Sequence, residues 1–280
     1  MTKIRIEHNT VQETLVIPLY GRKMCTERFP NLFRDDKAVE LIERLDYDFS
    51  GLEKQAKSMA YRFGALEVAM RENDLMIEMK DYLKEHPKAT LVNLGCGLDQ
   101  TAENVDNGIC RIVNIDLPDV IAVRNELLPE SERVNNLGCD LNDPAWMDEI
   151  DASNGVCLMA AGVFYYFKTD DLKKLFPAMA KRFPSGRLVF DAANKRAVKI
   201  MLKTWVKDAG VTSIADFFAV NRLDDLSWMK CAAITSRGYM LGYNDLRDPS
   251  VPGLFRLMAK LGDGFMKMQI IRMDFDKADR

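Results

Sequence analysis

One short stretch constrains the fold of this chain more than any other. The apolar run Thr90–Leu94 ends in Gly95-Cys96-Gly97, and an apolar run closed by glycines is typical of a buried strand that enters a tight turn. A second apolar run follows about 20 residues later and ends in Asp116. Strand, glycine turn, helix, strand and terminal acid together indicate the nucleotide-binding half of a doubly wound α/β sheet.

The glycines and the acid also restrict the ligand. Gly95 and Gly97 lack a Cβ atom, so the backbone can approach a ligand closely, and the Asp116 carboxylate can accept hydrogen bonds from both hydroxyls of a ribose. A dinucleotide site favours a third glycine where this chain has Gln100. The pattern therefore favours S-adenosylmethionine, a nucleoside ligand without phosphates. The structural alternative is an Asp116 that only caps the next helix.

Composition and charge exclude several classes of function. The 280 residues carry a net charge of −3, with basic residues scattered among acids, so no basic surface for nucleic acid is expected. No apolar run approaches the roughly 18 residues of a membrane span, and the first residues show no signal-peptide pattern. We therefore expect a cytoplasmic protein without nucleic-acid or membrane partners.

Histidine and cysteine chemistry is sparse in this chain. His8 and His86 are the only histidines, which leaves Ser-His-Asp and Cys-His catalysis without their usual base. The six cysteines never form a C-x-x-C pair, so neither a zinc site nor a disulfide framework is expected. The mechanism must run without a histidine, and no metal site is predicted.

The middle of the chain alternates between apolar runs and helical patterns. We predict strands at Thr90–Leu94, Cys110–Asp116, Arg133–Gly138, Gly155–Ala161 and Arg187–Asp191. Helices are predicted at Thr101–Val105, Pro118–Leu128, around Trp146, at Thr169–Phe183 with Thr169 as the N-cap, and from about Lys195 to Asp208. Five βα units in series predict a mostly parallel α/β sheet with helices on both faces.

Helical patterns precede this sheet, and a less regular tail follows it. Residues 35–45 and 51–84 have helical periodicity, the second as two helices or as one helix kinked near Gly64. The tail shows a strand fragment at 216–218, a helical turn at 224–229, a helix over 248–261 and a final strand over 264–275. We expect one domain over 1–280, with a helical lid over 1–86 and a Rossmann-like core over 87–280.

The ends of the predicted strands supply the candidate binding residues. Ligands of doubly wound sheets bind outside the carboxyl ends of the strands. The residues there are Gly95-Cys96-Gly97, Asp116-Leu117, Asp140-Leu141 and Ala160-Ala161. We predict that they bind the donor, with Asp140 accepting a hydrogen bond from the adenine amino group and Leu141 against the ring. The alternative is an Asp140 that caps the turn after it.

Two tyrosines follow the fourth predicted strand closely. Tyr165 and Tyr166 stand between Phe164 and Phe167. Aromatic side chains at this position can line a methyl-transfer site and orient an acceptor. We predict that the two tyrosines bind the acceptor, and packing in the core is the alternative.

Several of these motifs carry a resemblance to a known family. The chain resembles the leucine carboxyl methyltransferases at Val92–Asp99, Ile115–Val120 and Cys139–Leu141. It resembles the bacterial and fungal branch of that family, the O-methyltransferases of polyketide pathways, at Ala161–Phe167 and Phe183–Asp191. The resemblance implies a class I methyltransferase fold, in which seven strands end in an antiparallel hairpin and S-adenosylmethionine is the methyl donor.

The resemblance also implies roles for residues before the sheet. In the family an arginine on the helix before the first strand binds the methionine carboxylate, and Arg71 stands at that spacing. Arg22 and Lys23 match a basic position that helps to hold the donor, and we expect Tyr20 and Arg22 at the substrate as well. The alternatives are an exposed ion pair of Arg71 with Asp74 and a solvated basic loop.

Two departures from the family pattern bear on the acceptor. The family has Asp-Thr-Arg where this chain has Asp99-Gln100-Thr101, and the branch that methylates protein carboxyl groups has a Glu where this chain has Ala161. The second departure favours a small-molecule acceptor over a protein phosphatase.

The resulting functional hypothesis is an S-adenosylmethionine-dependent O-methyltransferase. Its acceptor is expected to be a carboxyl or hydroxyl group of a small molecule of the polyketide type. A carboxylate acceptor needs no base, a hydroxyl would benefit from one, and the sequence assigns no general base. A non-catalytic S-adenosylmethionine-binding protein and an NAD-dependent oxidoreductase are the alternatives.

Overall fold

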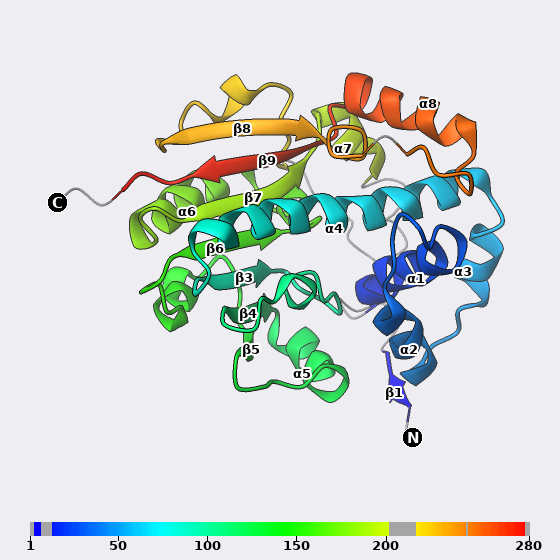
Figure 1. The fold of residues 1–280 in the computed structure, drawn as a ribbon, viewed down its shortest axis with the longest axis horizontal. Helices are drawn as coiled ribbons and strands as arrows, with labels where there is room; N and C mark the ends of the chain where they lie inside the picture. Colours follow the sequence, from blue (N-terminus) through cyan, green and yellow to red (C-terminus); the bar gives the residue numbers. More distant parts are fainter. Residues whose placement is uncertain (1–2, 7–12, 202–216, 245, 278–280) are drawn as a thin grey trace.

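A seven-stranded sheet with the order β5-β4-β3-β6-β7-β9-β8 forms the centre of the molecule. The computed structural model describes residues 3–6, 13–201, 217–244 and 246–277. The strands are β3 (Thr90–Leu94), β4 (Arg111–Asp116), β5 (Val134–Gly138), β6 (Val156–Ala160), β7 (Arg187–Ala192), β8 (Ala233–Gly238) and β9 (Gln269–Asp274). β3 to β7 pair in parallel, whereas β9 pairs antiparallel with both β7 and β8. The mostly parallel sheet and its terminal antiparallel hairpin are thus confirmed (Figure 1).

Helices surround this sheet. They are α1 (Glu13–Arg28), α2 (Asp36–Arg44), α3 (Ser50–Gln55), α4 (Met59–Glu85), α5 (Pro118–Leu127), α6 (Thr169–Arg182), α7 (Lys195–Met201) and α8 (Gly253–Leu261). Short 3-10 turns lie at Glu103–Val105, Pro144–Glu149, Phe164–Tyr166 and Leu223–Leu226, and a π-helical turn lies at Gly262–Met266. β1 (Ile4–Arg5) and β2 (Leu45–Asp46) form a separate parallel pair. Across the described ranges no helix is long and apolar enough to cross a membrane.

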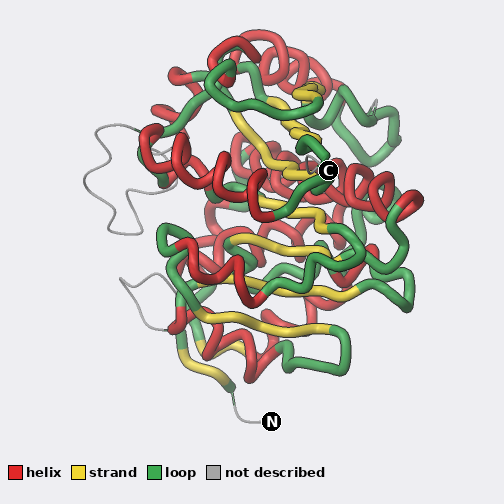
Figure 2. The backbone as a smooth tube through the Cα atoms, turned by 90° about the vertical axis from the view of Figure 1, so that its left-hand side faces the viewer, coloured by secondary structure: helices red, strands yellow, loops and turns green. Residues whose placement is uncertain are grey.

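The central strands are buried on both faces, as a parallel sheet covered by helices requires. Successive side chains of a strand point to opposite faces. Leu91 of β3 therefore belongs to a cluster with Leu75 of α4 and Val123 of α5, whereas its neighbour Val92 belongs to a cluster with Phe176 of α6. α4 and α5 cover one face and α6 covers the other, and Figure 2 shows the strands flanked by helices.

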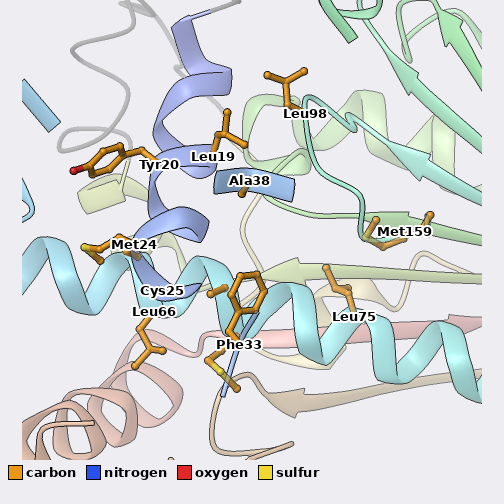
Figure 3. Packing of buried hydrophobic residues seen from close by; sticks show 14 of the residues in the cluster. Leu19, Tyr20, Met24, Cys25, Phe33, Ala38, Leu66, Leu75, Leu98 and Met159 are labelled. Atoms are coloured by element: carbon orange, nitrogen blue, oxygen red, sulfur yellow. The ribbon is translucent and has the colours of Figure 1, made fainter. Parts of the chain in front are cut away.

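The N-terminal helices reach the carboxyl ends of the parallel strands. α4 packs along β6, β7 and β9, and α1 packs against α4. Figure 3 shows Cys25 of α1 and Phe33 beside α4, whose Leu66 and Leu75 belong to the same buried cluster. α1 lies beyond the arrowheads of the central strands (Figure 1). This arrangement brings side chains of α1 and α4 to the edge of the sheet where a ligand is expected.

Several predicted boundaries differ from the structure. The helix expected at Thr101–Val105 is only a 3-10 turn, and α6 has Lys168 rather than Thr169 as its N-cap, without a side-chain capping bond. The segment 51–84 contains two helices that meet at residues 56–58 and not near Gly64, because the Ser58 hydroxyl caps α4 by accepting from the Tyr61 N–H at 3.2 Å.

The tail also differs from its prediction. β8 is an edge strand of alternating exposed and half-buried residues, so it lacks the apolar run that marks a buried strand. The final strand is shorter than expected because residues 262–266 form the π-helical turn. α7 is described to Met201; its predicted extension to Asp208, like Asp216 of the expected strand fragment, lies outside the described residues.

Candidate functional site

A cavity of about 660 Å³ lies at the carboxyl ends of the parallel strands. The loops after β3, β4, β5 and β6 contribute to its wall, and α1 and α4 close it from the other side. The predicted residues that line it are Arg22, Arg71, Gly95, Cys96, Gly97, Asp116, Leu117, Asp140, Leu141, Ala161 and Tyr166. Residues from six separate elements therefore meet at one place, as the strand-end rule for doubly wound sheets predicts.

The glycine turn after β3 has a conformation that suits only glycine. Gly95 has a φ of +66° and Gly97 a φ of +49°, a region that L-residues rarely adopt. A Cβ atom on Gly95 would lie 2.5 Å from Cγ2 of Val163, while one on Gly97 would lie 3.1 Å from Cδ2 of Leu15. The chain is thereby held close to the cavity without side chains that would fill it.

Asp116 fastens this glycine turn to the end of β4. One carboxylate oxygen accepts the Gly97 N–H at 2.7 Å, and the other accepts the Leu117 N–H at 2.8 Å. Burial raises the pKa of Asp116, and these two backbone N–H groups oppose the rise. Each carboxylate oxygen has a second lone pair, so Asp116 has acceptor capacity for a ligand in addition to its bond at the start of α5.

A buried arginine supports the turn from behind. Arg124 of α5 donates to the carbonyl oxygens of Gly97 at 3.0 Å and Asp99 at 2.7 Å, and it pairs with Glu103 at 2.6 Å. The Asp99 carboxylate accepts the Thr101 N–H at 3.0 Å and therefore serves the turn. Sequence reasoning missed Arg124, because an arginine inside an amphipathic helix is ordinarily exposed.

The loop after β5 contributes Asp140 and Leu141 to the cavity wall. Asp140 is exposed, and one of its oxygens accepts from both the backbone and the side-chain nitrogen of Asn142 at 2.9 Å. Leu141 is buried against the sheet. Ala160 differs from its neighbour Ala161, because it is fully buried at the end of β6 and does not line this cavity.

Arg71 of α4 stands at the opposite side of the cavity and is tied to the end of β7. Its Nη1 lies 3.0 Å from Oδ2 of Asp191, whose Oδ1 accepts the Gly162 N–H at 2.6 Å. A Cβ atom on Gly162 would lie 2.8 Å from that Nη1, so glycine at 162 makes room for the guanidinium. Burial alone would lower the pKa of Arg71, but Asp191 and the other acidic groups around it together raise it above its usual range. Among the described residues, the buried Nε of Arg71 has no hydrogen-bond partner.

The other two predicted N-terminal residues have protein partners. Arg22 is buried and donates to Asp35 at 2.9 Å, to Glu72 at 3.3 Å and to the carbonyl oxygen of Leu98 at 2.9 Å, so it links α1, α2, α4 and the glycine turn. Tyr20 stacks on Phe49 with ring centroids 5.9 Å apart, and it lines neither this cavity nor the second one.

A second cavity of about 310 Å³ adjoins the first. Arg71, Gly162 and Tyr166 line both cavities, as do Thr14, Pro18 and Ala161. Tyr165 lines only the second and is 3% exposed, whereas Tyr166 is 49% exposed. In the part of the chain that the structure describes, no group of three or more His, Cys, Asp and Glu side chains has an arrangement that could hold a metal ion.

A sequence model of the leucine carboxyl methyltransferases matches residues 19–180 of this chain. The match spans more than half of the sequence and includes the glycine turn, Asp116 and Asp140. The chain belongs to the leucine carboxyl methyltransferase family. The departures at Gln100 and Ala161 are therefore variations within this family.

One relative of this chain is the tetracenomycin polyketide synthesis O-methyltransferase TcmP of Streptomyces glaucescens. The two sequences are 29% identical over 183 residues, which are 65% of this chain and 66% of the relative. The match thus leaves a third of TcmP uncovered.

Two solved structures of other proteins have a fold similar to that of this chain. A candidate methyltransferase of Thermobifida fusca superimposes with a TM-score of 0.62 over 96% of this chain and 95% of its own, at 15% identity. A DUF574 family protein of Streptomyces avermitilis has a TM-score of 0.57 over 82% and 91% of the two chains, at 14% identity. The likeness supports the class I methyltransferase fold for the whole described chain.

Proposed function

We propose that this chain transfers a methyl group from S-adenosylmethionine to an oxygen of a small-molecule acceptor. The observation that carries this proposal is the pair of adjoining cavities at the carboxyl ends of the strands. The larger has an acid, a glycine turn and an arginine in its wall, and the smaller is mostly apolar. Arg71 and Gly162 at their junction mark where the methyl group would pass from donor to acceptor.

The residues of the larger cavity fit the three parts of the donor. Asp116 has spare lone pairs for ribose hydroxyls. Gly95 and Gly97 line the cavity without side chains, so they leave room for the nucleoside. Asp140 and Leu141 line the same cavity, and in this proposal they contact the adenine amino group and the adenine ring. The unpartnered Nε of Arg71, stated for the described residues, suits an anionic group such as the methionine carboxylate.

The chemistry places modest demands on the protein. The donor supplies a sulfonium electrophile, so the side chains orient the two substrates and exclude water. A carboxylate oxygen can attack the methyl carbon without a base, whereas a hydroxyl must lose its proton. Neither course requires a histidine, and among the described residues that line the two cavities there is none.

Family membership and the TcmP relationship support an O-methyltransferase with a small acceptor of the polyketide type. Ala161, small and at the junction of both cavities, leaves space for such an acceptor. A non-catalytic S-adenosylmethionine-binding protein is the second candidate, since donor residues can persist without turnover. Gln100 at the third glycine position disfavours an NAD-dependent oxidoreductase.

Ligand stabilisation and methyl transfer together test this function. S-adenosylhomocysteine should raise the melting temperature in a concentration-dependent manner because it binds only the folded state, and NAD should not. The opposite pattern would refute the methyltransferase proposal. Radiolabelled methyl transfer to a panel of aromatic phenols and carboxylic acids then separates an enzyme from a binding protein, which would be stabilised but would label no acceptor.

A further inference from the structure

The second cavity contains one acidic side chain, Glu67, in the wall that the structure describes. Glu67 lies on α4 one helical turn before Arg71, so both side chains project from the same face about 6 Å apart along the axis. Arg71 lines both cavities, and Glu67 lines only the second. Glu67 thus stands on the acceptor side of the junction.

The Glu67 carboxylate has no polar contact that would give it a structural role within the described residues. It is half-buried, and none of the described residues forms a hydrogen bond or an ion pair with it. Its Oε1 would be 3.8 Å from a Cβ atom placed on Gly262, a distance of ordinary contact. A carboxylate that lines a mostly apolar cavity without a partner is costly, which indicates that a ligand is its partner.

The other ionisable groups of the cavity wall do not compete as proton acceptors. Tyrosine has an ordinary pKa of about 10, and burial raises the pKa of Tyr61, Tyr165 and Tyr239 above it. The single cation of the described wall, Arg71, is paired with Asp191. The remaining nitrogens of Arg71 are proposed to bind the donor carboxylate, so the described wall has no further positive charge for an anionic acceptor. Its one carboxylate, Glu67, suits a neutral hydroxyl.

We propose that Glu67 is the general base of this chain and that its acceptor presents a phenolic or enolic hydroxyl. This inference rests on the proposed methyltransferase function. In the reaction the Glu67 carboxylate accepts the hydroxyl proton, and the acceptor oxygen forms a bond to the methyl carbon of the donor. The carbon–sulfur bond breaks, its electron pair stays on sulfur, and S-adenosylhomocysteine and a methyl ether result.

The surroundings of Glu67 tune its proton affinity. Burial raises the pKa of Glu67 to about 8, Asp263 of the π-helical turn raises it further, and Arg71 lowers it. Burial and the neighbouring Glu67 raise the pKa of Tyr239 well above its usual value, so this tyrosine stays protonated. A base with a pKa of about 8 gains activity as the pH rises through that value. Asp263→Asn removes a negative charge, so it should move the rise in rate to lower pH.

The test uses 2-naphthol and 2-naphthoic acid as probes, which differ only in the acceptor group. Three proteins are compared: the wild type, Glu67→Gln, and Glu85→Gln as a matched control at the exposed end of α4. Calorimetry first measures S-adenosylhomocysteine binding. Equal affinity for all three is expected because Glu67 does not line the larger cavity. Binding to none of them would refute the proposed function itself, independently of Glu67.

Binding of the two probes is then measured with S-adenosylhomocysteine bound, and their methylation is measured with S-adenosylmethionine bound. The wild type and Glu85→Gln should bind 2-naphthol in preference to 2-naphthoate, and Glu67→Gln should lose that preference. The rate of 2-naphthol methylation should fall about a hundredfold in Glu67→Gln, with loss of the rise near pH 8. Preference of the wild type for 2-naphthoate, binding of neither probe, or an unchanged pH profile in Glu67→Gln would each overturn the assignment.

Discussion

Arg71 and Asp191 are separated by 120 residues in the sequence, yet their side chains lie 3.0 Å apart at the boundary between the two cavities. Asp191 is the penultimate residue of the buried strand β7, and Arg71 of α4 reaches it at that strand's carboxyl end. The pair uses one guanidinium nitrogen, Nη1. The remaining nitrogens are the basis for the proposed contact of Arg71 with the carboxylate of the donor.

The first prediction concerns the geometry of the Arg71 side chain. Lysine keeps the positive charge but lacks the planar fork that can bind Asp191 and a ligand together. Arg71→Lys should therefore weaken S-adenosylmethionine binding at least about tenfold. Adenosine, which has no carboxylate, should bind both proteins equally in calorimetry. Arg62→Lys on the same helix is the control, since Arg62 lines neither cavity. Equal losses for both ligands would indicate a disturbed fold instead.

The second prediction concerns Asp116, which has structural bonds as well as its proposed ligand role. Asp116→Ala leaves the N–H groups of Gly97 and Leu117 without their acceptor. We expect the free energy of unfolding to fall by about 1–3 kcal/mol and adenosine affinity to fall at least about tenfold. Urea titration and calorimetry measure the two effects. A loss of stability with unchanged adenosine affinity would leave Asp116 only its capping role.

The third prediction separates the two reasons for a glycine at position 95. Gly95→Ala should lose stability both through its positive φ and through the contact with Val163. Gly108 has a φ of +85°, and a Cβ atom added there would have nothing within 4 Å, so Gly108→Ala reports the backbone cost alone, roughly 1–2 kcal/mol. Gly95→Ala should cost more than this.

A double-mutant cycle with Val163→Ala completes that comparison. The excess cost of Gly95→Ala over Gly108→Ala should shrink when Val163 loses its two γ-methyl groups, because one of them is the atom 2.5 Å from the added Cβ. Unfolding by urea measures all four proteins of the cycle. Strict additivity would show that sterics at Val163 do not explain the glycine.

The fourth prediction concerns Asp74, a buried acid of α4. Its Oδ2 accepts the N–H of Met240, whose φ is +69°, while its Oδ1 has no partner among the described residues. Burial raises the pKa of Asp74 from 3.8 to about 8. The folded state therefore binds a proton that the unfolded state has lost, and stability falls as the pH rises from about 4 to about 8.

Asp74→Asn should remove the contribution of Asp74 to this pH dependence, because asparagine resembles the protonated acid. The variant should match the wild type near pH 4 and exceed its free energy of unfolding by at least about 1 kcal/mol at pH 9. Urea unfolding at the two pH values measures the difference, with the exposed Asp119→Asn as control. A variant that is less stable than the wild type at pH 9 would contradict an ionisation cost at Asp74.

Local pattern was enough to predict the parallel strands β3 to β7 and one wall of the larger cavity, but not the edge strand β8. An apolar run ending in glycines, and acids directly after strands, are features of adjacent residues, so sequence alone could place Gly95, Asp116 and Asp140 at the strand ends. They all line the cavity. The same reasoning could not separate Ala160 from Ala161, since one residue decides which side chain faces the sheet and which faces the ligand space.

The opposite wall depended on contacts between distant segments. Sequence reasoning identified Arg71 only through family resemblance and missed Asp191, Arg124 and Glu67 altogether. A charged residue in a helical pattern is expected to be exposed. The neighbouring sequence does not indicate which strand end or cavity its side chain will contact. The environment of Tyr20 was not predicted either, because its ring stacks on Phe49, which belongs to a separate segment of the chain. By itself the sequence determined the positions of the parallel strands along the chain and the residues at their carboxyl ends, because short-range periodicity encodes them. Only the packing of α1 and α4 across that edge decided which charges face the cavities, because that is a long-range property.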